Sequence, residues 1–232
     1  MPAPLHVTTR KRHKFWGSSE FVHELQNVAI CVSQLIACFA FFHTASASFY
    51  VIACWTFFIT SVWGACQSLN QLYDHSMHYP SALELGHTQR ERVETVLLLV
   101  SALLFAVGSL AFLPSVSQLN EQFALYWGTT FFLVGSLFLL GASFVNSLSI
   151  TISTTIVITM DTHPEVWLGP VALLLNLFGS CCFCVGSVCF YPQLKGEGMT
   201  WSVVDVGTWW YVSGAVLYTG AAVAHLAHTA LK

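Results

Sequence analysis

The feature that most constrains this chain is a series of long apolar stretches with almost no charged residues. Inside a bilayer the backbone must satisfy its own hydrogen bonds, so such stretches form helices or closed barrels. Barrel strands would alternate apolar and polar residues over ~10 positions, but most stretches here are continuously apolar over the ~20 residues that a membrane helix needs. Charged residues make up only 8% of the chain, against roughly 25% in soluble domains, and this excludes a water-soluble globule.

The apolar stretches predict an all-α polytopic membrane protein with six transmembrane helices, arranged as three helical hairpins. The hairpins are expected over residues 24–69, 93–147 and 166–228. The six spans are expected at 24–42, 48–69, 93–113, 123–145, 166–191 and 206–226. The remaining segments are expected to be a basic N-terminal segment at 1–23, a cytoplasmic linker at 70–92, a β-branched connecting segment at 148–165 and a tail at 229–232.

The distribution of lysine and arginine supports an even number of spans. With six spans, one side of the membrane receives Arg10, Lys11, Arg12, Lys14, Arg90, Arg92 and Lys232, and the other side receives Lys195 alone. Lys and Arg accumulate in cytoplasmic loops. We therefore expect both termini to be cytoplasmic, and we read the basic cluster at the N-terminus as a determinant of topology.

Residues 148–160 do not fit a simple scheme of helices and loops. Isoleucine, leucine and methionine alternate there with serine and threonine, which is typical of a strand. A lone strand has no pairing partner in a helical membrane protein. The alternatives are a position at the membrane interface or a continuation of the preceding helix, and the sequence favours the helix.

Self-similarity within the chain points to a repeated unit. LLFAVGSLAFLP at 103–114 aligns without a gap on CCFCVGSVCFYP at 181–192, and GTTFFLVGS at 128–136 aligns on GTWWYVSGA at 207–215. The second and third hairpins are therefore predicted to be copies of one unit. A weaker third copy is expected in the first hairpin, where TFFITSVWG at 56–64 parallels TFFLVGSLF at 130–138.

Small residues recur at fixed places in the repeat, several of them seven positions apart and so on one helix face. Small residues let two helix backbones approach closely, which is what associates helices in lipid. We interpret them as packing and turn positions and not as a ligand-binding loop. The predicted helix-packing residues are Gly108, Ser109, Gly128, Gly135, Gly179, Gly186, Ser187, Gly207 and Gly214.

The hairpin motif resembles the YrhK-like family, a small two-helix membrane domain. The best matches are residues 97–140 and 175–219. The resemblance is carried by Phe105, Gly108, Ser109, Phe112, Pro114, Gly128, Thr129, Phe132, Gly135 and Ser136, and in the later copy by Phe183, Gly186, Ser187, Phe190, Pro192, Gly207, Thr208 and Gly214. It implies an architecture and brings no established activity with it.

Few residues suggest chemistry. Gln34 and Asn176 are the clearest polar groups inside the predicted spans, and each is expected to hydrogen-bond a neighbouring helix. His225 and His228, three apart, are weak candidates for cofactor binding. The chain contains no catalytic motif, so we expect no enzyme activity, no bound metal and no cofactor.

Three functions remain open. The first is a non-enzymatic structural or accessory role in a membrane, and the second is a small transporter or channel. The third is a haem- or metal-binding membrane protein. The expected partners are the lipid bilayer and either further copies of the chain or a larger membrane complex, and the small net charge of −3 gives no reason to expect nucleic acid. A polar cavity through the bundle would favour the transporter, whereas a closed apolar interior would exclude it.

Overall fold

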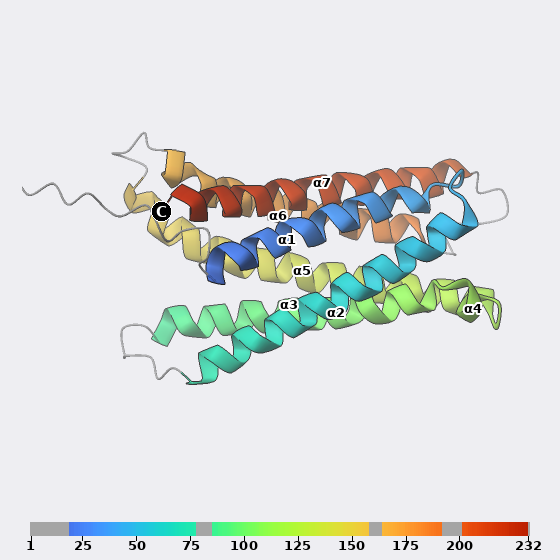
Figure 1. Ribbon diagram of the computed structural model, residues 1–232, viewed down its shortest axis with the longest axis horizontal. Helices are drawn as coiled ribbons and strands as arrows, with labels where there is room; N and C mark the ends of the chain where they lie inside the picture. Colours follow the sequence, from blue (N-terminus) through green and yellow to red (C-terminus); the bar gives the residue numbers. More distant parts are fainter. Residues whose placement is uncertain (1–18, 78–84, 158–163, 192–200, 232) are drawn as a thin grey trace, which may run out of the picture.

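The protein is an all-helical bundle in the part of the chain that its computed structural model describes, residues 19–77, 85–157, 164–191 and 201–231 (Figure 1). No strand occurs in these ranges. The helices are α1 (Ser19–Cys38), the short 3₁₀ helix η2 (Phe39–Phe41), α2 (Ala47–Met77), α3 (Leu85–Ala111), α4 (Pro114–Ser117), α5 (Glu121–Val157), α6 (Pro164–Cys189) and α7 (Trp201–Leu231).

Six long helices run up and down in chain order and close into a ring. Each packs against its neighbours in the sequence, and α7 packs against α1. Helix α1 begins and α7 finishes at one end of the bundle, which we call the terminal end (Figure 1). The opposite end carries the turn after η2 and helix α4, and we call it the loop end (Figure 1). Among the neighbouring pairs of long helices, α1 and α2 contact each other least.

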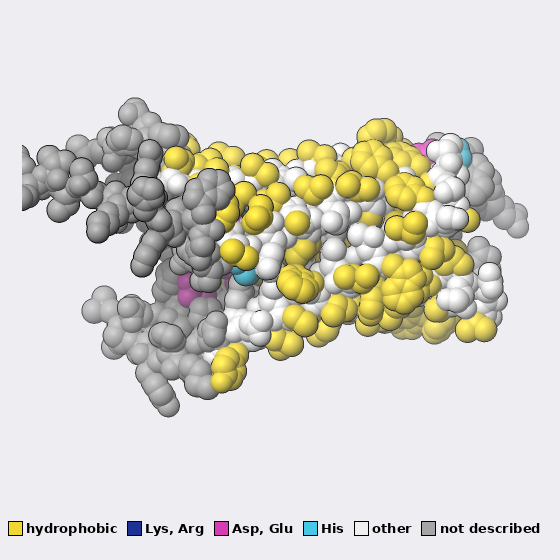
Figure 2. All heavy atoms as spheres, in the orientation of Figure 1, with side chains coloured by type: hydrophobic (Ala, Val, Ile, Leu, Met, Phe, Trp, Pro, Cys, Tyr) yellow, Lys and Arg dark blue, Asp and Glu magenta, His cyan; other side chains and the backbone are white. Residues whose placement is uncertain are grey.

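The polarity of the bundle is inverted relative to a soluble protein. Large apolar side chains point outward, including Ile36, Ile52 and Ile59, which are 57–61% exposed. Hydrophobic side chains accordingly occupy much of the visible face of the bundle (Figure 2). Serine and threonine side chains are buried instead, and many donate to a carbonyl one turn earlier, as Ser136 does to Phe132 at 2.8 Å. This arrangement suits a protein whose solvent is lipid.

Five helices, α1, α2, α3, α5 and α6, are long and apolar enough to cross a membrane. The sixth predicted span, 206–226, falls within α7, which has 31 residues but is not one of the five. The structure thus supports five candidate spans, and the sixth stays a prediction.

Several helices are longer than the predicted spans. Helix α2 continues to Met77 and α3 begins at Leu85, so both extend into the predicted linker at 70–92. Helix α5 continues to Val157, so the β-branched segment is helical up to that residue, as the sequence favoured. Residues 158–163 lie outside the described ranges. Apolarity indicates where a chain enters lipid, but a helix can continue into water because its backbone hydrogen bonds are internal.

An aromatic layer forms the core of the ring, nearer to the loop end than to the terminal end. Its centre is built by Phe57 of α2, Phe132 of α5 and Tyr211 of α7. The ring centroids of Phe57 and Phe132 are 6.2 Å apart, and those of Phe132 and Tyr211 are 6.1 Å apart. The surrounding aromatic side chains are Phe41, Phe105, Phe112, Phe183 and Phe190. The layer divides the interior of the bundle into a terminal part and a loop part.

Candidate functional site: a chamber inside the helix ring

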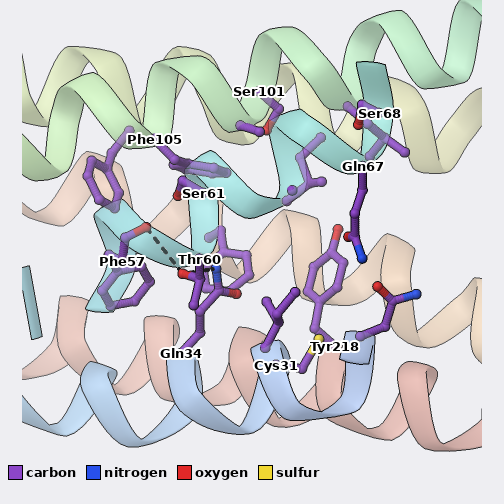
Figure 3. Close-up of a pocket in the computed structure, with 18 of the residues that line it drawn as sticks. Cys31, Gln34, Phe57, Thr60, Ser61, Gln67, Ser68, Ser101, Phe105 and Tyr218 are labelled. Carbon is purple, nitrogen blue, oxygen red and sulfur yellow. Dashed lines mark hydrogen bonds between the residues drawn. The ribbon is translucent and has the colours of Figure 1, made fainter. Parts of the chain in front are cut away.

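A cavity of about 300 Å³, which we call the chamber, lies on the terminal side of the aromatic layer. All six long helices contribute to its lining. Phe57, Phe132 and Tyr211 form its apolar floor, while much of its polar surface comes from α1 and α2. The polar side chains of these two helices that line it include Gln34, Thr60, Ser61, Gln67 and Ser68 (Figure 3). Asn27 of α1 lines it as well.

A smaller cavity, about 140 Å³, lies on the loop side of the layer, and we call it the outer cavity. Its lining is largely apolar and includes Tyr50, Leu125 and Val204. Phe132 and Tyr211 line both cavities. The two cavities are therefore in line along the bundle, with the aromatic layer between them.

The first helix of each hairpin shows why the chamber lies beside α1 and α2. Phe41, Phe112 and Phe190 occupy similar positions around the aromatic layer. Seven residues earlier in the sequence stand Gln34, Phe105 and Phe183. The first hairpin thus places an amide where the other two place a phenyl ring.

The second helix of each hairpin carries a matching difference. The central aromatic residues Phe57, Phe132 and Tyr211 are each followed three positions later by a smaller residue: Thr60, Gly135 and Gly214. A Cβ atom at Gly135 or Gly214 would lie 3.3 or 3.2 Å from a phenylalanine ring of its hairpin partner, so ring and glycine are in close contact. In the first hairpin Gln34 Nε2 instead donates to Thr60 Oγ1 at 3.1 Å (Figure 3).

One turn farther toward the terminal end, the three hairpins differ again. Seven residues after the central aromatics stand Gly64, Leu139 and Tyr218, and all three line the chamber. Leu139 and Tyr218 fill space with large side chains. A Cβ atom at Gly64 would have Ala102 Cβ as its nearest neighbour, at 3.9 Å, so the volume beside it is open. This missing side chain is a main source of the chamber.

Gln67 supplies an unused hydrogen-bond donor to the chamber. Its Nε2 atom is shielded from solvent and has no hydrogen-bond partner within the described ranges. The side chain extends from α2 toward Tyr218 of α7 (Figure 3). The Tyr218 hydroxyl is already bonded to Ser180, whose hydroxyl also contacts Ser143 Oγ at 3.2 Å. A buried amide without a partner is costly, so this donor suits an acceptor that the protein itself does not provide.

The lining of the chamber lacks strongly acidic and basic side chains within the described part of the chain. Among the described residues that line it there is no Asp, Glu, Lys or Arg, and His23 is its one imidazole. Several of its hydroxyls are occupied by internal bonds, such as that of Ser101, which donates to the Gly135 carbonyl at 2.9 Å. The chamber can therefore bind through neutral hydrogen bonds and apolar contacts.

The predicted packing residues lie at the contact between the two helices of the second hairpin and at the corresponding contact within the third. A Cβ atom at Gly108 would lie 2.5 Å from the Phe132 ring, and one at Gly186 would lie 2.9 Å from the Tyr211 ring. Gly128 and Gly207 face Phe112 and Phe190 in the same way. Between α6 and α7 the backbones themselves approach closely, because a Cβ at Gly214 would lie 3.0 Å from the Gly179 carbonyl oxygen.

The predicted serines show the same correspondence. Ser109 donates to the Phe105 carbonyl at 2.7 Å, and Ser187 donates to the Phe183 carbonyl at 2.8 Å. Both are buried. Ser187 also bonds the Tyr211 hydroxyl at 2.7 Å and so links α6 to the aromatic layer.

The remaining predicted residues lie apart from the chamber. Asn176 is half-buried on α6, and its carbonyl accepts a bond from Ser180. His225 and His228 are half-buried near the end of α7, and neither lines the chamber. Within the described ranges no three His, Cys, Asp or Glu residues are grouped as a metal site would require.

The structure also brings together pairs that the sequence did not single out. Asn146 Nδ2 donates to Glu94 Oε1 at 2.9 Å between α5 and α3. At the loop end, His43 Nδ1 lies 2.7 Å from Asp205 Oδ2. The hydrogen bond from His43 lowers the pKa of the Asp205 carboxyl below its ordinary value. The partners in each pair are 52 or 162 positions apart, so no local pattern could have identified them.

The comparison with known families falls on the hairpin of α6 and α7. Residues 170–230 match the model of the YrhK-like protein family. This segment is a YrhK-like domain. The resemblance seen in the sequence is thereby confirmed for the later copy, expected at 175–219. The YrhK-like domain spans most of α6 and nearly all of α7, including Gly179, Gly186 and Gly214. No curated protein and no solved structure matches the chain.

Proposed function

We propose that the chain consists of three tandem copies of one hairpin, of which the YrhK-like domain is the third. The contacts of Gly108, Gly128 and Gly135 in the second hairpin recur at Gly186, Gly207 and Gly214 in the third. Each set packs against aromatic side chains of its own hairpin, at similar distances. Equivalent contacts at equivalent positions support duplication more strongly than a shared sequence motif does.

The burial of the first hairpin supports its place as a third copy, in a register that differs by one residue from the sequence parallel. That parallel aligns Phe58 with Phe132. Phe57 is the buried one, at 5% exposure, and its ring contacts Phe132, whereas Phe58 is half-buried. Ala53 and Cys54 are then buried at the positions of the Gly-Thr pairs that begin at Gly128 and Gly207.

Bonds between successive hairpins support a closed ring. Thr129 of α5 donates to the carbonyl of Phe190 in the next hairpin at 3.4 Å. Thr208 of α7 donates in the same way to the carbonyl of Phe41 in the first hairpin at 3.2 Å. The ring brings the start of α1 and the end of α7 to one end of the bundle (Figure 1). We propose that it crosses the membrane six times, with the terminal end on the cytoplasmic side.

The ring, in this proposal, is a small transporter for an uncharged molecule. One observation carries this function: the chamber and the outer cavity lie in line and are separated by an aromatic layer. A solute site flanked by a movable barrier is the minimum that alternating access requires. A structural bundle has no need of an internal cavity lined by an amide donor that lacks a partner among the described residues, so the structural or accessory role ranks second.

Accessibility of single cysteines from the two sides of the membrane tests this function. Gly64→Cys places a thiol in the chamber, and Leu125→Cys places one in the outer cavity. In sealed vesicles of known orientation, a membrane-impermeant maleimide should label the first from the cytoplasmic side and the second from the other side. Val62→Cys, whose side chain is 40% exposed toward lipid, is the control and should not react.

A double variant distinguishes a transporter from a rigid bundle. With both cysteines present, a bulky adduct at position 64 should hold the chamber open and slow labelling at position 125 severalfold. Labelled peptides are quantified by mass spectrometry, which separates these thiols from the native cysteines. Unchanged labelling at position 125 would favour the structural role, and labelling from the reversed sides would overturn the proposed topology.

A further inference from the structure

The unpaired Gln67 amide defines what the chamber can hold. Nε2 is a donor, and within the described ranges no acceptor in the protein reaches it. Nε2 has almost no accessible surface as it stands, so an acceptor oxygen of a ligand can satisfy it once the flexible Gln67 side chain turns toward the chamber. The same ligand would lie over Phe57 and Phe132, which offer only apolar surface. The complement of this chamber is a molecule with a polar acceptor at one end and an apolar body.

The absence of Asp, Glu, Lys and Arg from the described lining narrows the range of ligands further. A carboxylate, phosphate or ammonium placed beside Gln67 would meet none of these side chains among the described residues of the lining, where Nδ1 of His23 is already paired with Asn27 Nδ2 at 3.3 Å. Transfer of an unpaired charge from water into such a site is strongly unfavourable. The ligand is therefore uncharged, and a volume of about 300 Å³ suits a small molecule or the head of a larger one.

The seam between α1 and α2 indicates how the ligand enters. These two helices contact each other least in the ring, and the chamber lies between them. Their outward faces are apolar, with Leu25 and Val32 on α1 and Trp63 on α2 39–50% exposed. White atoms, which belong to the backbone and to uncharged side chains outside the hydrophobic set, lie along the seam between the two helices, with hydrophobic side chains on either side (Figure 2). A molecule dissolved in the bilayer can reach this seam without crossing water.

We infer that the chamber binds an uncharged, lipid-soluble molecule, which enters from the bilayer between α1 and α2 and whose acceptor oxygen is bound by Gln67 Nε2. This inference rests on the proposed transport function and names its substrate class. The side chains of Gln34 and Thr60 hydrogen-bond each other and form part of the wall of the binding site. Mass action then requires that such a molecule stabilise the folded protein.

Three amphiphiles with the same ten-carbon chain test the inference on the purified full-length chain. Monodecanoylglycerol is uncharged and carries acceptor oxygens, decanoate is anionic, and decylamine is cationic. Below their micelle-forming concentrations, monodecanoylglycerol should raise the midpoint of thermal unfolding by several degrees, and the two charged probes should not. In the wild-type chain monodecanoylglycerol should also slow alkylation of Cys31, which lines the chamber, by N-ethylmaleimide.

Gln67→Leu removes the donor and keeps the size of the side chain, so it should abolish both effects. Gln26→Leu is the matched control, since Gln26 is exposed on α1 outside the chamber lining, and it should retain both. If Gln67→Leu fails to fold, Gly64→Leu fills the open volume and should abolish the effects with the donor in place.

Three outcomes would contradict the inference. Equal stabilisation of wild type and Gln67→Leu would show nonspecific partitioning, and a larger effect of decanoate or decylamine would show that the ligand is charged. Protection of Cys31 by acetamide, which is water-soluble, and not by monodecanoylglycerol would place entry on the aqueous side. None of these results bears on the labelling at positions 64 and 125, so the transport function can stand while this inference falls.

Discussion

The hairpin of α6 and α7 and the hairpin of α1 and α2 share one up-and-down plan, yet they pack differently. The YrhK-like domain has glycine on both helices, and Gly179 and Gly214 bring the two backbones into close approach. Helix α1 contains no glycine, and its Gln34 meets Thr60 instead of placing a phenyl ring on a glycine. The first hairpin lacks this close contact between backbones, and it lines a chamber. A few side chains are therefore enough to distinguish a tightly packed hairpin from one that lines a cavity.

The largest expected effect comes from closing the glycine seam. In Gly186→Ala the new Cβ would lie 2.9 Å from the Tyr211 ring and 3.1 Å from the Gly207 carbonyl oxygen, so a ring or a backbone must move. Overpacking of this kind typically costs about 1–3 kcal/mol. Unfolding in mixed micelles measures the loss of stability.

Gly64→Ala is the matched control for the seam, because its Cβ would have no neighbour closer than 3.9 Å. It should unfold like the wild type, or slightly later, because alanine favours a helix. Equal destabilisation at positions 64 and 186 would remove the contrast between the two hairpins.

The second prediction rebuilds the first hairpin on the pattern of the third. The double variant Gln34→Phe/Thr60→Gly replaces the amide–hydroxyl pair by a ring on a glycine, as at Phe183 and Gly214. Filling part of the chamber should raise stability by roughly 1–2 kcal/mol. Unfolding in mixed micelles measures the gain, and N-ethylmaleimide should react more slowly with Cys31.

Gln26→Phe adds the same ring on the exposed face of α1 and should change neither quantity. Faster alkylation of Cys31 in the double variant would mean that Gln34 does not limit the chamber.

A smaller effect is expected at the contacts between hairpins. Thr208→Val removes the bond to the Phe41 carbonyl at nearly constant volume and should cost about 0.6 kcal/mol, the mean for such bonds in membranes. Thr129→Val removes the equivalent bond to Phe190 and should cost about the same if the three hairpins form one ring. Thermal unfolding of both variants tests the equivalence, and a large effect in only one of them would contradict it.

The smallest effect concerns the loop end, where His43 and Asp205 join the first hairpin to the third. The pKa of Asp205 is lowered in the folded state from its ordinary value of 3.8 by the hydrogen bond from His43. The pair's contribution to stability is therefore complete above that value and is lost as the pH falls through the lowered pKa. The effect is small because the carboxyl is exposed to solvent and screened.

Asp205→Asn should lack this step, so stability measured from neutral pH to below pH 3.8 should fall less in the variant than in the wild type. Thermal unfolding across this range is the measurement. Parallel curves for the two proteins would show that the contact does not tie the hairpins together.

Much of the architecture could be predicted from local pattern. Helices could be assigned because apolar runs of sufficient length have only one open-chain solution in lipid. The positions of Gly108, Gly128, Gly186 and Gly207 could be named because small residues repeat at fixed spacing. The first hairpin's register could not be fixed by sequence, since the one-residue choice between Phe57 and Phe58 depends on which ring reaches the shared core.

The sequence by itself determined that this chain is helical, belongs in a membrane and ends in a YrhK-like hairpin, because hydrophobic length and small-residue spacing are local properties. Only the tertiary structure decided that six helices close into a ring and that the first hairpin lines a chamber. Gln67 shows the reason. In the sequence it is one amide near the end of an apolar run. Its donor, which has no partner among the described residues, borders a chamber only because five other helices surround that space.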